Sequence, residues 1–133
     1  MMLREIRDYI ESLGVSEKVY MGKLPDKLQE AIGVYNSKHT YECKVPLGGV
    51  QMRSYETKYV TLLIHWNKSP TETEEAGKRL FDALTATREK GKIKFIQPLY
   101  DLQDVGTDDS GVYEMVIEAA FICRKENENV GTK

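Results

Sequence analysis

One strand-to-helix boundary constrains the fold of this chain more than any other feature. The segment Tyr59–Trp66 is rich in β-branched and aromatic residues and mostly apolar on both faces, which is typical of a central strand covered on at least one side. Ser69 then offers an N-cap, Pro70 occupies the first helical position and Glu72 completes a capping box. The pattern predicts a helix over residues 70–88 with a buried stripe of Ala76, Leu80, Ala83, Leu84 and Thr87.

The remaining predicted elements add one helix and several strands. Apolar residues spaced three and four apart, followed by Gly14, predict a helix over residues 2–13. Residues 26–31 are expected to form one helical turn, and strands are expected at 17–24, 32–35, 93–96 and 112–124. The predicted fold class is therefore α+β, an antiparallel or mixed sheet with two helices packed on it.

Two segments lack a regular pattern. Residues 38–58 contain the pair Gly48-Gly49, which predicts a protruding hairpin arm with the glycines at its tip. Residues 101–111 are acidic and contain two glycines, so we expect a loop there.

Length, charge and cysteine content exclude several classes of function. The chain has 133 residues, which predicts a single domain over residues 1–126 and a polar flexible tail at 127–133. Its 19 basic and 21 acidic residues give a formal net charge of −2, so we expect neither nucleic-acid recognition nor membrane binding. The sequence has no long apolar run and no signal-peptide pattern. Cys43 and Cys123 are compatible with a disulfide, but a reduced, cytoplasmic setting is the simpler interpretation.

The residues that often carry chemistry do not combine into a recognisable site. His65 lies inside the strongest strand, where a histidine is usually a hydrogen-bonded structural residue. His39 and Cys43 have the spacing of a metal-ligand pair, but a structural zinc site needs two further ligands. The pair Gly48-Gly49 lacks the other residues of a phosphate-binding loop.

The acidic segment at residues 101–111 also falls short of a calcium loop. Its carboxylates come from Asp101, Asp104, Asp108 and Asp109, but the glycine and glutamate positions of an EF-hand are missing. Basic residues are scattered along the chain and form no nucleic-acid-binding patch. The residues therefore predict an interaction domain without catalytic residues, a metal or a cofactor.

Several short segments match the pattern of one protein family. They are Ile32–Asn36, Gly48-Gly49, Ser54-Tyr55, Leu62–Lys68, Thr73-Glu74 and Asp104–Glu114. Together with the opening helix they extend over nearly the whole chain, from about Leu3 to about Glu126. On these residues the chain resembles the phage minor capsid proteins that are encoded in the head–tail region of phages and prophages of Gram-positive bacteria.

The order of the predicted elements is also similar to that of the tail terminator, or tail-completion, proteins of long-tailed phages. Those proteins are small α+β subunits that form a six-membered ring on the tail tube, stop its growth and present a surface to the head connector. The resemblance implies a non-enzymatic virion protein at the head–tail junction, assembled in the host bacterial cytoplasm. The implied partners are further copies in a homo-oligomeric ring, the tail tube protein and the head connector or head-completion protein.

The ring interpretation gives contact roles to both irregular segments. The arm contains residue types that are enriched at interfaces, and the acidic segment offers an adaptable charged contact. The predicted contact residues are Gly48, Gly49, Met52, Arg53, Tyr55, Asp104, Asp108 and Asp109. The alternative for each segment is an ordinary solvent-exposed loop.

Two further functions are compatible with the sequence. The first is a head-completion or connector subunit in the same virion. The second, from a different class, is a small ligand-binding domain or enzyme. A deep pocket that gathers His65 with a carboxylate favours this second function, whereas a shallow surface there opposes it.

Overall fold

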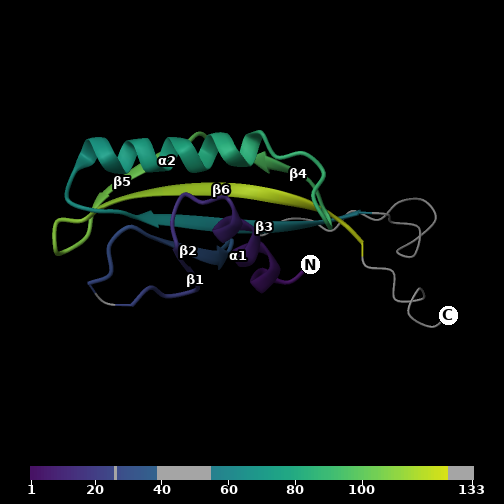
Figure 1. Cartoon of the computed structure of the whole chain (residues 1–133), viewed down its shortest axis with the longest axis horizontal. Coiled ribbons are helices and arrows are strands. Elements are labelled where there is room, and N and C mark those ends of the chain that lie inside the picture. Colours follow the sequence, from purple (N-terminus) through teal and green to yellow (C-terminus); the bar gives the residue numbers. More distant parts are fainter. Residues whose placement is uncertain (26, 39–54, 126–133) are drawn as a thin grey trace.

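The computed structural model describes residues 1–25, 27–38 and 55–125, which form a six-stranded sheet with two helices (Figure 1). The elements are α1 (Leu3–Ser12), β1 (Lys18–Met21), β2 (Ala31–Asn36), β3 (Tyr55–His65), α2 (Pro70–Thr85), β4 (Ile93–Pro98), β5 (Gln103–Thr107) and β6 (Tyr113–Arg124). This arrangement confirms the predicted α+β fold class.

The sheet is built around the two longest strands. Its order is β1-β2-β3-β6-β4, and β5 also pairs with β6. The β3–β6 ladder is antiparallel and extends from the pair Tyr55 and Arg124 to the pair His65 and Glu114. Only β1 and β2 are parallel among the paired strands that the structure describes, so the sheet is mixed.

Both helices cover the same face of this sheet. The alternate residues of β3 and β6 that point to this face are buried, and they form one apolar core with Ile6 and Ile10 of α1 and with Leu80 and Leu84 of α2. Tyr9 of α1 also contacts the segment that follows α2, because its hydroxyl lies 2.6 Å from the Thr87 hydroxyl. The other face of the sheet carries no helix in the described part of the chain.

β4 and β5 share the outer side of β6 and together form one interrupted edge. β4 pairs with residues 119–123 of β6, and β5 pairs with residues 113–116. The prediction of a loop over residues 101–111 is therefore wrong for the five residues of β5. The side chains of β5 are mostly exposed and show no alternation of apolar and polar residues, so the sequence carries no periodic pattern of a strand there. The strand is formed instead by backbone pairing with β6.

The N-terminus of α2 is capped in a different way from the predicted capping box. The Ser69 hydroxyl accepts a hydrogen bond from the Glu72 backbone N–H at 3.2 Å, as expected. The Glu72 carboxylate instead accepts from Asn67 Nδ2 at 2.8 Å, and the Ser69 N–H donates to Asn67 Oδ1 at 2.9 Å. The helix ends at Thr85, three residues before the predicted end, and its predicted stripe is buried except for the half-buried Ala83.

The connection between β1 and β2 contradicts the predicted helical turn at residues 26–31. Lys27 and Glu30 have φ values of 63° and 57°, in the left-handed region that a right-handed helical turn excludes. Ala31 already belongs to β2. A nine-residue connection between parallel neighbours must reverse the chain twice, and these left-handed residues lie in that path.

The predicted arm lies largely outside the described residues. Residues 55–58, assigned to it from the sequence, extend β3 instead, and residues 39–54 are not described. The predicted tail at residues 127–133 is likewise outside the described part. No helix among residues 1–25, 27–38 and 55–125 is long and apolar enough to span a membrane.

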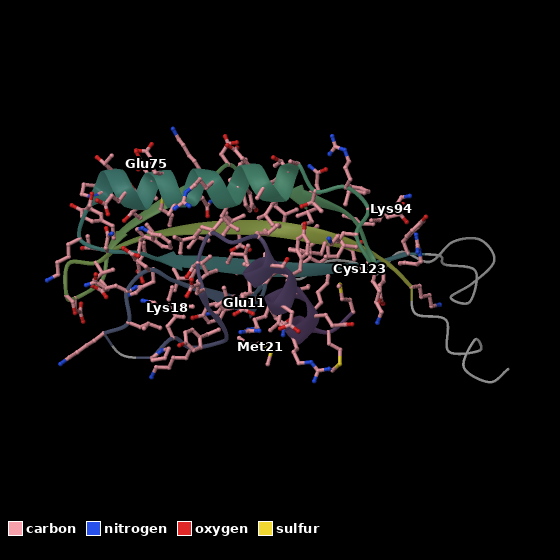
Figure 2. The ribbon with its side chains drawn as sticks, in the orientation of Figure 1. Glu11, Lys18, Met21, Glu75, Lys94 and Cys123 are labelled. Atoms are coloured by element: carbon pink, nitrogen blue, oxygen red, sulfur yellow. The ribbon has the colours of Figure 1, made fainter. Side chains whose placement is uncertain are left out.

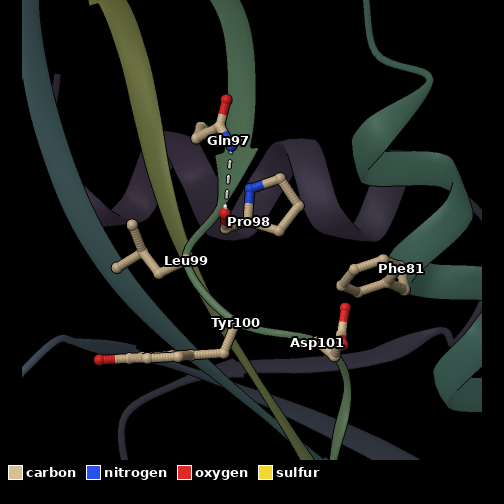
Figure 3. Close-up of a pocket in the computed structure, with 6 residues that line it drawn as sticks. All are labelled: Phe81, Gln97, Pro98, Leu99, Tyr100 and Asp101. Carbon is tan, nitrogen blue, oxygen red and sulfur yellow. Dashed lines mark hydrogen bonds between the residues drawn. The ribbon is translucent and has the colours of Figure 1, made fainter.

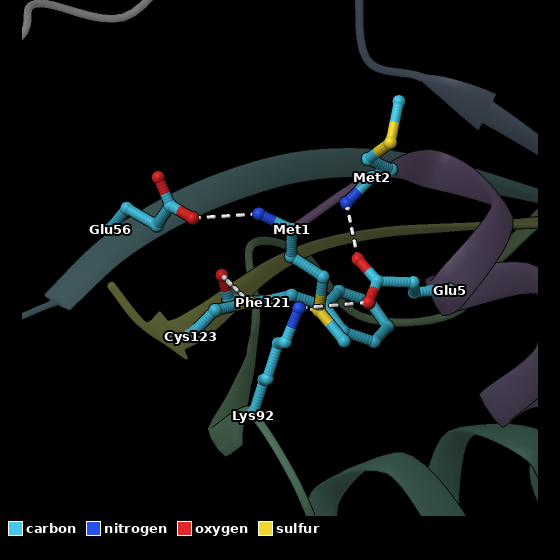
Figure 4. A network of polar contacts seen from close by, with 7 residues as sticks. All are labelled: Met1, Met2, Glu5, Glu56, Lys92, Phe121 and Cys123. Carbon is cyan, nitrogen blue, oxygen red and sulfur yellow. Dashed lines mark hydrogen bonds and ion pairs between the residues drawn. The ribbon is translucent and has the colours of Figure 1, made fainter. Parts of the chain in front are cut away.

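A polar network attaches the start of α1 to the sheet (Figure 4). The Met1 amino group lies 2.6 Å from Glu56 Oε2 on β3. Glu5 accepts from the Met2 N–H at 2.8 Å and pairs with Lys92 at 3.1 Å, and these contacts lower the pKa of Glu5. The network joins α1, β3 and the segment before β4, which are far apart in the sequence.

Candidate functional site

The structure describes four of the eight predicted contact residues, and they do not form one site. Gly48, Gly49, Met52 and Arg53 lie outside the described residues. Tyr55 begins β3 and is exposed, with Lys94 Nζ 5.9 Å from its ring centroid. Asp108 and Asp109 lie near the other end of β3. His65 ends this strand and lies close to Asp108.

The last part of the predicted acidic loop, which follows β5, is a β-hairpin turn with an organised carboxylate. Asp108 Oδ1 accepts hydrogen bonds from the backbone N–H groups of Ser110 at 2.8 Å and Val112 at 3.0 Å. The bond from Val112, the bond from Ser110 and the nearby His65 lower the pKa of Asp108, although its desolvation acts in the opposite direction. Asp109 is exposed at the turn. Asp108 therefore has a structural role in the β5–β6 turn.

The structure brings His65 together with two carboxylates. Its Nδ1 lies 2.7 Å from Glu114 Oε2, and its Nε2 lies 3.6 Å from Asp108 Oδ2. The side chain is 12% exposed. Because each ring nitrogen faces a carboxylate, this geometry suits a histidine that joins β3 to the β5–β6 hairpin. Burial and, to a lesser extent, the Glu114 charge raise the pKa of the neighbouring Tyr35 hydroxyl.

A groove of about 510 Å³ lies between α2 and β5 and contains Asp104. Its apolar side chains are Phe81, Leu102 and Met115. The charged side chains that line it are Glu74, Lys78, Asp82, Asp101 and Asp104. Lys78 lies 3.7 Å from Glu74, so the α2–β5 groove, as we name it, keeps an excess of acidic charge. An apolar surface lined by carboxylates favours an apolar ligand with cationic neighbours.

Gly77 allows two apolar side chains of the groove to approach α2. A Cβ atom at this position would lie 2.9 Å from Met115 Sδ and 3.1 Å from Leu102 Cδ2. Both distances are shorter than ordinary van der Waals contact, so a larger residue would push these side chains away from the helix. The glycine therefore sets the depth of the groove.

Two neighbouring hollows extend this groove along α2. A hollow of about 120 Å³ at the helix N-terminus shares Glu74, Asp104 and Met115 with it. Another, of about 560 Å³, shares Phe81 and Asp101 and follows the interruption between β4 and β5 (Figure 3). None of these three hollows is lined by His65.

Most of the large exposed apolar side chains lie at the two ends of the sheet order, whereas Met2 and Tyr55 lie elsewhere. Among the described residues, large exposed apolar side chains at the β1 end are Tyr20 and Met21. At the β4–β5 end they are Phe95, Tyr100 and Val105. Soluble domains seldom place several large apolar side chains together on an exposed edge unless another molecule covers them.

The described residues show no metal site. No group of three or more histidine, cysteine, aspartate or glutamate side chains among them could hold a metal ion. His39 and Cys43, the possible ligand pair, lie outside the described part. Cys123 is a buried free thiol whose pKa is raised mainly by burial, which suits a packing role.

No protein-family model matches the chain, and no curated protein sequence matches it.

Sequence reasoning missed three features of these surfaces. Asn67 bonds both Glu72 and the Ser69 N–H, but a lone asparagine between two elements has no distinctive pattern. Met21 is exposed because β1 is an edge strand, and a sequence does not show which strand lies at an edge. The α2–β5 groove combines residues from α2, β5, β6 and the segment before β5, which only the tertiary fold brings together.

Proposed function

We propose that this chain is a structural protein of a phage virion and acts as a tail terminator. In this role, copies of the chain form a ring that caps the tail tube and docks to the head connector. The resemblance to phage minor capsid proteins and the α+β order of elements support this proposal. The function requires protein surfaces and no catalytic residue.

The observation that carries the proposal is the presence of two different exposed apolar surfaces at opposite ends of the sheet. Tyr20 and Met21 lie at one end, and Phe95, Tyr100 and Val105 lie at the other. A ring closed by head-to-tail contacts needs two different surfaces on each subunit, since one copy's first surface meets the next copy's second. An enzyme of this size would instead be expected to converge its polar groups in one pocket.

Deletion of the gene from the phage or prophage that encodes it tests this function. We expect tails of irregular length that do not join to heads, with normal virions restored by the wild-type gene supplied in trans. Electron microscopy measures tail length and head attachment. Tails of normal length joined to heads would overturn the proposal.

The same experiment separates the head-completion alternative. A head-completion subunit would co-purify with filled heads, and its loss would leave tails of normal length that fail to attach. A tail terminator would co-purify with tails. The chain's presence in purified tails or in filled heads, measured by mass spectrometry, distinguishes the two.

A further inference from the structure

The face of the sheet that α1 and α2 leave uncovered is largely apolar. The strand register assigns to it the residues that alternate with the buried core residues of each strand. Three large exposed apolar side chains lie on it, Tyr20, Tyr55 and Phe95. Half-buried apolar side chains fill the space between them: Tyr35, Tyr59, Leu63, Val116 and Ile122. We name these eight residues the open face.

The extent of the open face matches what a stable dimer needs. At about 3.3 Å per residue and 4.8 Å between strands, the strands present roughly 700 Å² on this side of the sheet. Two copies packed face to face would bury about 1,400 Å², which lies within the range of stable protein interfaces. Because each copy covers the other side of its sheet with helices, the pair would have the layers helix, sheet, sheet and helix.

The two ends of the open face carry opposite charge. Arg124 ends β6, and Glu89 pairs with both Arg124 and Lys94, so this end keeps one positive charge. Figure 2 shows Lys94 at this end of the sheet. Glu114 and Asp108 lie at the other end, beside the last residue of β3.

These charges select one orientation for the pair. A two-fold axis across the strands places Arg124 of each copy opposite Glu114 of the other, and Ile122 opposite Val116. A two-fold axis along the strands would instead bring ends of like charge together. Lys18 lies on the same side of the sheet as the open face but on the edge strand β1, and its Nζ donates to the Gln29 carbonyl.

Glu118 is the charged residue in the middle of this side of the sheet. Its carboxylate accepts from the Thr61 hydroxyl at 2.8 Å and from the Ser37 hydroxyl at 3.4 Å. In the orientation across the strands, Glu118 lies opposite Ala120 of the other copy, whose small side chain leaves room for these bonds. A carboxylate that keeps its hydrogen bonds is compatible with a packed interface.

We propose that two copies of the chain pair through their open faces, with their strands antiparallel across the contact. The same surface of both copies takes part, so the contact is isologous and closes at two copies. This contact is independent of the proposed ring, because it joins copies face to face rather than end to end.

Acidic substitutions on the open face test the pairing. The test variant combines Thr57→Asp and Phe95→Asp, two exposed positions on either side of Ile122. The matched control combines Met21→Asp and Thr71→Asp, which also replace one large apolar residue and one threonine at exposed positions. Met21 lies on the helix side of β1, and Thr71 lies in the first turn of α2, so both are outside the open face.

Sedimentation velocity measures self-association of the full chain up to about 1 mM. We expect the wild type and the control to dimerise. The test variant should dimerise at least about 100-fold more weakly, because its carboxylates would be buried against apolar side chains. The fluorescence of buried Trp66 during urea unfolding shows whether each variant is folded.

Spin labels measure the orientation of the two copies. Asp109→Cys in a Cys43→Ser background places a label at the exposed β5–β6 turn. Antiparallel packing separates the two labels by about the length of β6, roughly 40 Å for its 12 residues. Packing about an axis along the strands would bring them to roughly 10–20 Å, since packed sheets lie about 10 Å apart.

The proposal is overturned if the wild type stays monomeric at about 1 mM, in which case another segment of the chain or a different protein covers the open face. It is also overturned if the test variant dimerises as the wild type does, if the control weakens the dimer equally, or if the two labels lie close together. The deletion experiment is independent of these outcomes. Normal tails joined to heads in the deletion phage, with the dimer intact, would remove only the proposed function.

Discussion

Asn67, which lies between β3 and α2, provides the most direct test of how the fold is held together. Its Nδ2 donates to Glu30 Oε2 at 3.1 Å and to Glu72 Oε1 at 2.8 Å. Its Oδ1 accepts from the Ser69 N–H at 2.9 Å. One side chain thus joins the β1–β2 connection and the first turn of α2 to the end of β3.

We expect Asn67→Ala to lower the free energy of unfolding by about 2 kcal/mol, from three partly exposed hydrogen bonds of roughly 0.5–1.5 kcal/mol each. Ser69→Ala removes one capping bond and should cost about 1 kcal/mol. For a domain of this length, about 1 kcal/mol corresponds to a Tm change of roughly 4 °C. The double variant should cost less than the sum, because both residues bond the same helical turn.

Urea unfolding followed by the fluorescence of Trp66 measures these changes. Trp66 is the only tryptophan of the chain, is buried and directly precedes Asn67. Asn36→Ala, at an exposed position that ends β2, is the matched control and should stay within about 0.5 kcal/mol of the wild type. If Asn67→Ala costs no more than this control, the reasoning about its side-chain bonds is refuted.

Three further outcomes are expected. Leu80→Ala should lower the free energy of unfolding by about 3 kcal/mol because Leu80 is fully buried in the core, whereas exposed Arg79→Ala should have little effect in urea unfolding. The lowered pKa of Asp108 stabilises the fold above about pH 4, and this contribution is lost as the pH falls through its folded pKa. The stability deficit of Asp108→Asn should therefore shrink in acid, and a deficit that grows would contradict this. In a Cys43→Ser background, iodoacetamide should label buried Cys123 only on unfolding, as mass spectrometry can measure.

The elements with strong local signals were predictable from the sequence. α2 begins as predicted because Ser69 and Pro70 act within one turn of chain, independent of the rest of the fold. β6 was predictable because its alternate residues face one buried layer over twelve positions. The α+β class follows from such elements, since each apolar face must be covered by another element.

The candidate interaction surfaces were only partly predictable. Asp104 was predicted as a contact residue and does lie in the α2–β5 groove, but the sequence placed it in a loop with Asp108. In the structure Asp104 belongs to an edge strand, and Asp108 caps a turn and faces His65. Asp104 and Asp108 are close in the sequence, but the pairing of β5 with β6 places their carboxylates in different surroundings.

The sequence by itself determined that α1, α2, β3 and β6 form, because capping, apolar periodicity and β-branched composition act over a few consecutive residues. The tertiary structure alone decided that β1 and the β4–β5 edge lie at opposite ends of the sheet. It also decided that Phe81, Leu102 and Met115 share one groove. Strand order and grooves arise from contacts between residues distant in the chain, and no local pattern records those contacts.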